Sequence, residues 1–169
     1  MTRPLHWALG VLVLSAVAGN GTVARLTGGS GEARPAGEAA SLDAEGAPVV
    51  TLQQDWSGHY LVHPQIEGRR TRMLVDTGAT LCALTQDDAE RAGIRLAERD
   101  FTRPMATANG VVRGAPVRLA EVQVGGITVR NVEAVVLPRG RLDTSLLGMS
   151  FLRRLRGFEA AGGRLTLRG

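Results

Sequence analysis

Leu74-Val75-Asp76-Thr77-Gly78-Ala79-Thr80, a stretch near the middle of the chain, joins an apolar run to Asp-Thr-Gly. The residues from Thr71 to Val75 predict a short strand that leads directly into the motif. Gly78 permits a sharp turn that points a carboxylate out of a sheet, and the Thr77 hydroxyl can brace that turn by hydrogen bonding. Asp76 is therefore a candidate catalytic carboxylate at a strand end. For the bare tripeptide, a purely structural tight turn is the alternative.

Composition around this stretch predicts an all-β fold. The 169 residues are 44% hydrophobic and 21% charged, which is typical of one soluble globular domain, and 22 glycines with only 4% aromatics favour short strands and tight turns. Strands are expected at 49–54, 60–66, 71–75, 101–106, 111–124 and 127–137, with a closing hairpin of 158–160 and 165–167. Short helices are expected after Thr85 and from Met149 to Leu155. In the first helix, Asp87, Asp88 and Glu90 are expected to complement the helix start.

Charge and cysteine content exclude several classes of site. The 20 basic residues are all arginines, and they are spread along the chain without a basic stripe, so no nucleic-acid surface is predicted. The single Cys82 cannot form an internal disulfide and is expected to be a small buried residue. His59 and His63 are four residues apart in an expected strand and so share a face, but no acidic residue or Cys lies near them. We therefore predict neither a metal nor another cofactor.

The N-terminal third has a different organisation. Residues 1–18 contain Arg3, an apolar run and a small-x-small ending, which predicts a signal peptide or a retained membrane anchor. Residues 19–48 are rich in Gly and Ala without apolar periodicity, which predicts a flexible linker. The folded domain is then expected at 49–169. This arrangement predicts a periplasmic protein that is either soluble or tethered to the inner membrane.

Four segments together resemble the retropepsin-like aspartic proteases, in particular their bacterial membrane-anchored branch. They are Leu-Val-Asp-Thr-Gly-Ala-Thr at 74–80, Thr-Ala-Asn-Gly at 107–110, Val-Gly-Gly-Ile at 124–127 and Leu-Leu-Gly-Met-Ser-Phe-Leu at 146–152. The resemblance covers nearly all of 49–169. It implies a single-lobe closed β-barrel of the acid protease fold with one or two short helices.

The resemblance also implies roles for individual residues. Asp76 would be catalytic, with Thr77, Gly78 and Ala79 supporting the active-site loop, and Thr107, Ala108, Asn109 and Gly110 would form the tip of a flap that closes over substrate. Each lobe of this family supplies one aspartate, so a homodimer acting on a polypeptide substrate is implied. Two carboxylates in contact share one proton, which predicts activity at acidic to mildly acidic pH.

Two other classes of function remain open at this point. A binding or assembly module could keep the lobe and its dimer contacts without hydrolysis. An exported β-sandwich domain for adhesion or transport would make the Asp-Thr-Gly coincidental. A structure distinguishes the last possibility, because it shows whether Asp76 lies in an active-site loop.

Overall fold

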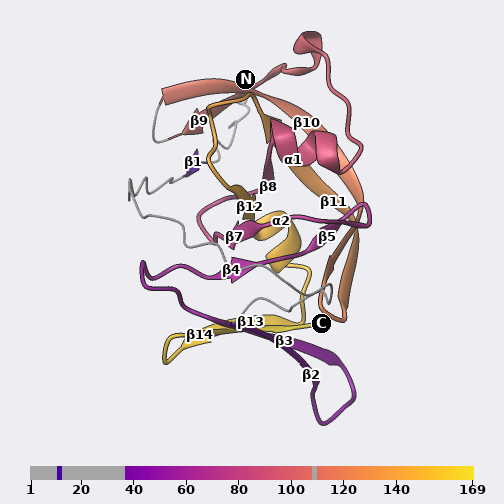
Figure 1. The fold of residues 1–169 in the computed structure, drawn as a ribbon, viewed down its shortest axis with the longest axis vertical. Helices are drawn as coiled ribbons and strands as arrows, with labels where there is room; N and C mark the ends of the chain where they lie inside the picture. The colour runs from indigo at the N-terminus through magenta and orange to yellow at the C-terminus, as the bar shows by residue number, and fades with distance from the viewer. Residues whose placement is uncertain (1–10, 13–36, 108–109) are drawn as a thin grey trace, which may run out of the picture.

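The computed structural model describes residues 11–12, 37–107 and 110–169, and its strands form two sheets (Figure 1). The larger sheet runs in the order β1 (Val11–Leu12), β9 (Arg103–Thr107), β10 (Gly110–Val124), β11 (Ile127–Leu137), β8 (Cys82–Thr85), β12 (Ser145–Leu147), β7 (Met73–Val75) and β4 (Leu61–Val62), with β5 (Gln65–Ile66) on β10 and β6 (Arg69–Arg70) on β5. The smaller sheet has the order β13 (Gly157–Ala161), β14 (Arg164–Arg168), β3 (Pro48–Gln53) and β2 (Glu38–Leu42). Helices α1 (Gln86–Arg91) and α2 (Met149–Leu152) and the 3₁₀ turn η1 (Glu98–Asp100) complete the described elements.

The long strands β10 and β11 give the larger sheet its curvature. They pair antiparallel from Ala115↔Val136 to Val124↔Ile127 across the turn Gly125-Gly126, and Figure 1 shows them sweeping around the side of the molecule. Buried and exposed residues alternate along much of β10 and the first part of β11, which is the period of a half-buried sheet, whereas residues 134–137 are all buried. The sheet curls into a half-barrel, so the predicted all-β fold is confirmed.

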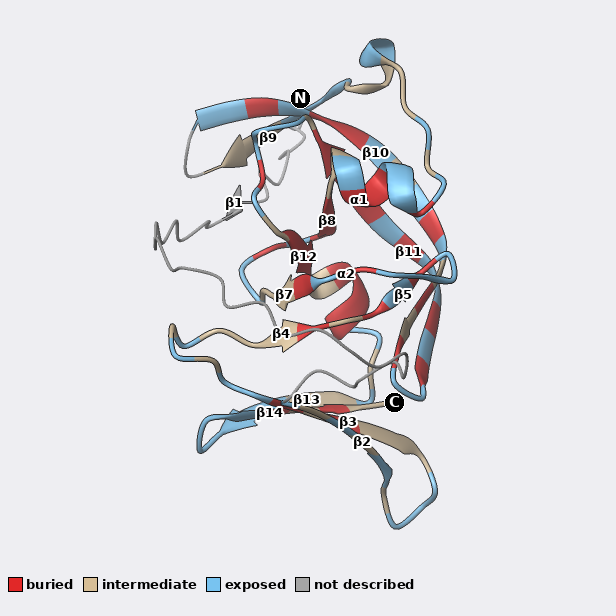
Figure 2. Cartoon of the chain, viewed as in Figure 1, coloured by how far each residue is buried: buried red, intermediate tan, exposed pale blue. Residues whose placement is uncertain are grey.

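Both sheets contribute to one main core. Val50 and Leu52 of β3 and Leu167 of β14 are fully buried, and they belong to the same cluster as Leu119 of β10 and Phe151 of α2. Figure 2 shows buried residues alternating with exposed ones along the long strands and concentrated in α2. The short helix α2 therefore fills the space between the two sheets.

Several predicted boundaries need correction. The strand predicted at 60–66 is two separate strands, β4 and β5, because β4 pairs with β7 while β5 turns away to pair with β10 on the other side of Pro64. Proline cannot donate to a sheet ladder, which explains the break. The second helix ends at Leu152, three residues earlier than predicted.

The predicted linker at 19–48 is also wrong over its last part. Strand β2 pairs antiparallel with β3 from Glu38↔Leu52 to Leu42↔Pro48. Backbone pairing to an existing sheet edge orders this segment although its sequence has no strong apolar pattern, and Ala40 packs against the main core. Asp43 then stabilises the turn after β2, where its Oδ1 accepts hydrogen bonds from the backbone N–H groups of Glu45 and Ala47.

The predicted signal or anchor, residues 1–18, lies outside the described residues except for Val11 and Leu12, which pair in parallel with Ala106 and Thr107 of β9. Residues 19–36 of the predicted linker also lie outside them. Within the part of the chain that is described, no helix is long and apolar enough to cross a bilayer. Export, a periplasmic location and membrane tethering therefore stay predictions.

His63 links β2 to the segment between β4 and β5 and should make stability depend on pH. Its side chain is about one-fifth exposed, and its Nδ1 lies 3.7 Å from Glu38 Oε2, too far for a good hydrogen bond. Burial lowers the pKa of His63, with further lowering by the positive charge of Arg70, and these effects outweigh the opposing effect of Glu38. The folded state therefore favours neutral His63.

Stability contributed by neutral His63 should be lost as the pH falls. Below about pH 6.5 the unfolded chain binds a proton at this residue more readily than the folded chain does. The free energy of unfolding therefore decreases as the pH is lowered. His63→Gln removes this titration and should show a smaller drop in Tm between pH 7.5 and 5.5 than the wild type. The measurement is thermal unfolding at both pH values. Equal drops in the two proteins would show that His63 does not contribute.

Candidate active site

Asp76 follows the last residue of β7 and begins a tight loop. Its side chain is partly buried, and Oδ1 accepts a hydrogen bond of 2.8 Å from the Gly78 N–H. The Ala79 N–H donates to the Asp76 carbonyl at 3.3 Å, which closes the turn. Thr77 and Gly78 are exposed, whereas Ala79 is fully buried and anchors the loop. The loop therefore holds a carboxylate at the protein surface on a buried base.

The expected brace from Thr77 is not observed. Among the described residues its hydroxyl makes no hydrogen bond, and the Gly78 N–H orients the Asp76 carboxylate instead. A backbone donor is present whatever side chain follows, so the turn conformation alone supplies this contact. Thr77 is exposed, and its role in supporting the loop stays a prediction.

Both ends of the loop are bonded to one distant segment of the chain. The Asp76 N–H donates to the Leu147 carbonyl at 3.1 Å, and the Met149 N–H donates to the Ala79 carbonyl at 2.8 Å. Strand β12 lies between β7, with which it is parallel, and β8, with which it is antiparallel. The segment Leu147 to Met149 thus passes directly beneath the active-site loop and fixes its two ends.

Gly148 lies at the closest point of this crossing. A Cβ atom on Gly148 would stand 2.2 Å from the Leu81 carbonyl oxygen and 2.7 Å from that of Ala79. Both are backbone atoms of the active-site loop and the residues just after it, so no side-chain movement could relieve the clash. The glycine is therefore required by space rather than by backbone conformation, since its φ of −95° is open to any residue.

Two serines extend the short pairing between β12 and β8. Ser150 Oγ accepts a hydrogen bond of 2.8 Å from the Cys82 N–H, and Ser145 Oγ accepts one of 3.0 Å from the Thr85 N–H. Both serines are buried, and they lie on either side of Leu146 to Gly148. They satisfy backbone donors of β8 that three-residue β12 cannot reach, which keeps the base of the site paired.

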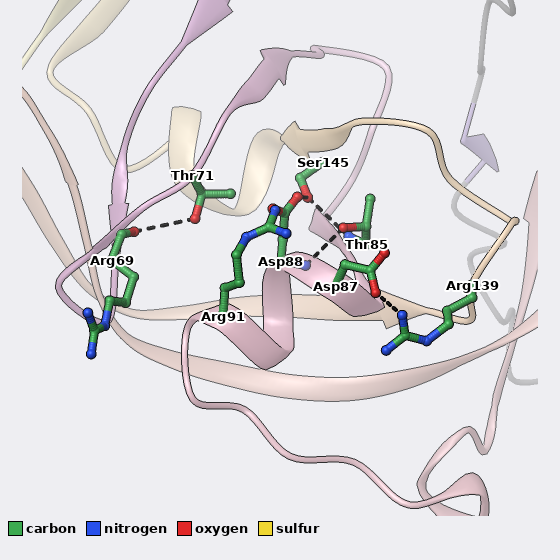
Figure 3. A network of polar contacts seen from close by, with 8 residues as sticks. All are labelled: Arg69, Thr71, Thr85, Asp87, Asp88, Arg91, Arg139 and Ser145. Carbon is green, nitrogen blue, oxygen red and sulfur yellow. Dashed lines mark hydrogen bonds and ion pairs between the residues drawn. The ribbon is translucent and has the colours of Figure 1, made fainter. Parts of the chain in front are cut away.

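Asp88 joins this framework to helix α1 through a buried polar network (Figure 3). Its carboxylate accepts a hydrogen bond from the Ser145 hydroxyl and pairs with Arg91, while its N–H donates to Thr85 Oγ1 at 3.1 Å. The Thr85 cap confirms the predicted helix start. Our prediction for Asp88 was incomplete, because it is buried and bonded to β12 as well as complementing the helix. In the sequence, the only sign of this contact is Ser145 at the start of an apolar run. That sign can be interpreted only when β12 and α1 are known to be neighbours.

The other two acids of α1 have an exposed partner. Asp87 and Glu90 both pair with Arg139, and the hydrogen bond from Arg139 holds the pKa of Glu90 below its ordinary value (Figure 3 shows Asp87 and Arg139). Exposed ion pairs of this kind contribute little stability. They hold the loop after β11 against α1, away from Asp76.

The predicted flap is the hairpin of β9 and β10. Its strands pair from Gly114↔Arg103 to Gly110↔Thr107, and Thr107 Oγ1 donates to the Gly110 carbonyl at 2.8 Å. Ala108 and Asn109 of the predicted tip lie outside the described residues. At the base of the hairpin, Met105 and Val112 pack in a second apolar cluster, whose other members are Leu74, Ala79, Leu81, Ala83, Val135, Leu137, Leu142 and Leu146. This cluster connects the hairpin to the floor of the active-site loop.

The cysteine and the two histidines considered in the sequence make no contact with Asp76 among the hydrogen bonds and ion pairs of the described residues. Cys82 is fully buried, as expected, and burial raises the pKa of its thiol. His59 lies in a turn, not in a strand, and contacts Ser57, whereas His63 contacts Glu38, so the two do not converge as a pair. Across residues 37–107 and 110–169, no group of three or more His, Cys, Asp or Glu side chains is placed to hold a metal ion.

Comparison with known families agrees with this geometry. The family model described as gag-polyprotein putative aspartyl protease matches residues 62–154, which is more than half of the chain and includes the active-site loop, the hairpin and β12. The chain belongs to this aspartyl protease family. The resemblance found in the sequence is thereby confirmed at the level of the family.

Solved structures place this family member among the retropepsin-like folds. A retropepsin-like aspartic protease from Rickettsia conorii has a TM-score of 0.66 and 32% sequence identity, over 78% of this chain and 94% of that one. The EIAV protease in complex with the inhibitor HBY-793 has a TM-score of 0.50 and 17% identity, over 63% of this chain and 97% of that one, and shows similarity of fold alone.

Two sequence relatives of this family member are described as uncharacterized proteins. One, a protein encoded in the cobV 5′ region of Sinorhizobium sp., is 44% identical over 126 residues, which are 75% of this chain and 54% of the relative. Another, from Rickettsia prowazekii (strain Madrid E), is 37% identical over 110 residues, which are 65% of this chain and 47% of the relative. The chain thus spans about half the length of the curated relatives it matches.

Proposed function

We propose that the protein is an aspartic endopeptidase that hydrolyses peptide bonds with two Asp76 carboxylates, one from each of two copies of the chain. The observation that carries the proposal is the active-site loop itself: it holds Asp76 at the surface, orients the carboxylate through Gly78 N–H and is fixed at both ends by β12 and α2. One chain supplies one such loop, and hydrolysis by carboxylates alone needs two. The second loop comes from a second chain related by a two-fold axis.

The chemistry follows from two carboxylates that share one proton. The ionised carboxylate takes a proton from a water molecule whose oxygen attacks the carbonyl carbon of the scissile bond, while the protonated carboxylate donates to the carbonyl oxygen. Transfer of a proton to the amide nitrogen then allows the C–N bond to break, which gives a carboxylic acid and an amine. The hydrogen bond from Gly78 N–H keeps Oδ1 oriented throughout.

The substrate would be an extended polypeptide lying between the β9–β10 hairpin and the active-site loop. Main-chain hydrogen bonds to the hairpin would hold such a segment in place, as in other strand-addition modes of recognition. The shared apolar cluster beneath both elements gives them a common rigid base. Substrates would have to be locally unfolded to enter.

A site made of two chains should lose activity on dilution. Below the dimer dissociation constant the rate of cleavage should fall with the square of the chain concentration, because the dimer population does. The measurement is cleavage of an unfolded protein substrate across a dilution series of the purified full chain. A rate strictly proportional to concentration, in a preparation shown to be monomeric, would contradict the two-chain site. A stable dimer without any cleavage would instead favour a binding module.

A further inference from the structure

Trp56 is the most exposed large apolar side chain in the described part of the chain. It is 88% exposed, compared with 78% for Val111 on the hairpin and 69% for Leu42 on β2. Trp56 lies in the loop of residues 54–60, which joins β3 to β4 and which we call the Trp56 loop. An isolated exposed apolar residue needs no explanation, so the case depends on how this loop is held and where it lies.

The Trp56 loop is rigidly organised around Asp55. Asp55 Oδ1 accepts hydrogen bonds from the Ser57 N–H at 2.9 Å, the Ser57 hydroxyl at 2.7 Å and the His59 N–H at 2.9 Å. The backbone closes the same turn, with Asp55 N–H donating to the His59 carbonyl at 2.8 Å and Gly58 N–H to the Asp55 carbonyl at 3.0 Å. The backbone of such a loop loses little freedom when a partner binds, which favours its use as a binding anchor.

The Trp56 loop also lies beside the active-site loop. Its last residue, Tyr60, accepts a hydrogen bond of 3.0 Å through its carbonyl from the Val75 N–H, one residue before Asp76. In Figure 1 the Trp56 loop, the active-site loop and the end of the β9–β10 hairpin at Thr107 and Gly110 all face the same side of the molecule. The Trp56 loop therefore lies on the side from which a second active-site loop would approach.

The order of strands separates Trp56 from the predicted path of the substrate. In the strand order of the larger sheet, β9 and β10 lie near one end and β7 and β4 lie at the other. The Trp56 loop, which leads into β4, thus flanks the active-site loop on the side away from the hairpin. A peptide held between hairpin and active-site loop would not need to reach it.

From this placement we infer that Trp56 is an anchor of the interface with a second copy of the chain. The inference rests on the proposed two-chain site. Two Asp76 carboxylates that share a proton bring the two-fold axis next to Asp76, so the exposed side chain of a loop bonded beside the active-site loop would meet the partner chain. Because the interface is symmetric, each dimer contains the contact twice, and buried tryptophans are prominent among residues that dominate interface energetics.

The test compares Trp56→Ala with Leu42→Ala, a matched loss of an exposed apolar side chain on β2. Dimer dissociation constants of the full chain are measured by sedimentation, and kcat and KM are measured at concentrations where each protein is dimeric. Trp56→Ala should raise the dimer dissociation constant about tenfold or more, Trp56→Phe should raise it less, and Leu42→Ala should leave it nearly unchanged. Once dimeric, Trp56→Ala should retain wild-type kcat.

Three results would overturn the inference. They are an unchanged dissociation constant in Trp56→Ala, a rise in KM without any change in dimerisation, which would make Trp56 a substrate contact, and a wild-type chain that stays monomeric. Failure of the proposed function has a different signature. A wild type that dimerises through Trp56 but cleaves nothing would support this interface and reject the peptidase.

Discussion

Asp76→Asn should lower kcat/KM for peptide cleavage by about three orders of magnitude, the scale of combined acid and base catalysis. In the homodimer this change removes both carboxylates, so neither the base that activates water nor the acid that protonates the carbonyl oxygen remains. The Asn side chain keeps the size of Asp and its oxygen can still accept the Gly78 N–H hydrogen bond, so the fold should be unchanged. The measurement is cleavage of an unfolded protein by purified wild type and variant.

Two further proteins make this experiment decisive. Glu45→Gln, a like-for-like loss of one exposed carboxylate in the β2–β3 turn, should cleave at the wild-type rate. A mixed dimer with one Asp76→Asn chain should be nearly as inactive as the double variant, because one carboxylate cannot perform both roles. Full activity of Asp76→Asn in a preparation free of other proteases would reject the mechanism.

Among the described glycines, Gly148 should be the one where substitution by alanine is most damaging. The added Cβ would lie 2.2 Å from the Leu81 carbonyl oxygen and 2.7 Å from that of Ala79, so either β12 or the active-site loop must move. We expect the free energy of unfolding to fall by about 3 kcal/mol and activity to fall as well, because the loop carries Asp76. Denaturant unfolding and the cleavage assay measure the two effects.

Gly157→Ala is the matched control for Gly148→Ala. A Cβ on Gly157 meets nothing within 4 Å, so stability should change by no more than about 0.5 kcal/mol. A Gly148→Ala protein as stable and active as this control would show that the crossing beneath the loop has room to relax.

Local sequence signals predicted much of the fold. Strand β11 was predicted from Ile127 to Leu137 and found there, since alternation and the flanking Gly125-Gly126 turn are both local. Asp76 was correctly placed at a strand end for the same reason: the apolar run and the Asp-Thr-Gly are adjacent in sequence.

Features that depend on distant partners were not predictable in the same way. Strand β2 is ordered by the edge of β3, and Asp88 is buried because Ser145 happens to lie opposite it, 57 residues away. The bond from Gly78 N–H to Asp76 was not predicted, because the sequence shows which side chains can donate a hydrogen bond but not which backbone groups a turn brings within reach. Such features follow from packing between elements, which no local pattern records.

The bonding of the active-site loop to Leu147 and Met149 has a consequence for the timing of biosynthesis. Asp76 leaves the ribosome more than seventy residues before the segment that fixes its loop, and until that segment arrives the Asp76 N–H and Ala79 carbonyl lack their native partners. Strand β3 likewise has no partner on its β14 side until β14 has been synthesised. The active-site loop therefore cannot reach its native bonding until Leu147 to Met149 has left the ribosome, which delays the proposed peptidase site until most of the described domain has been made.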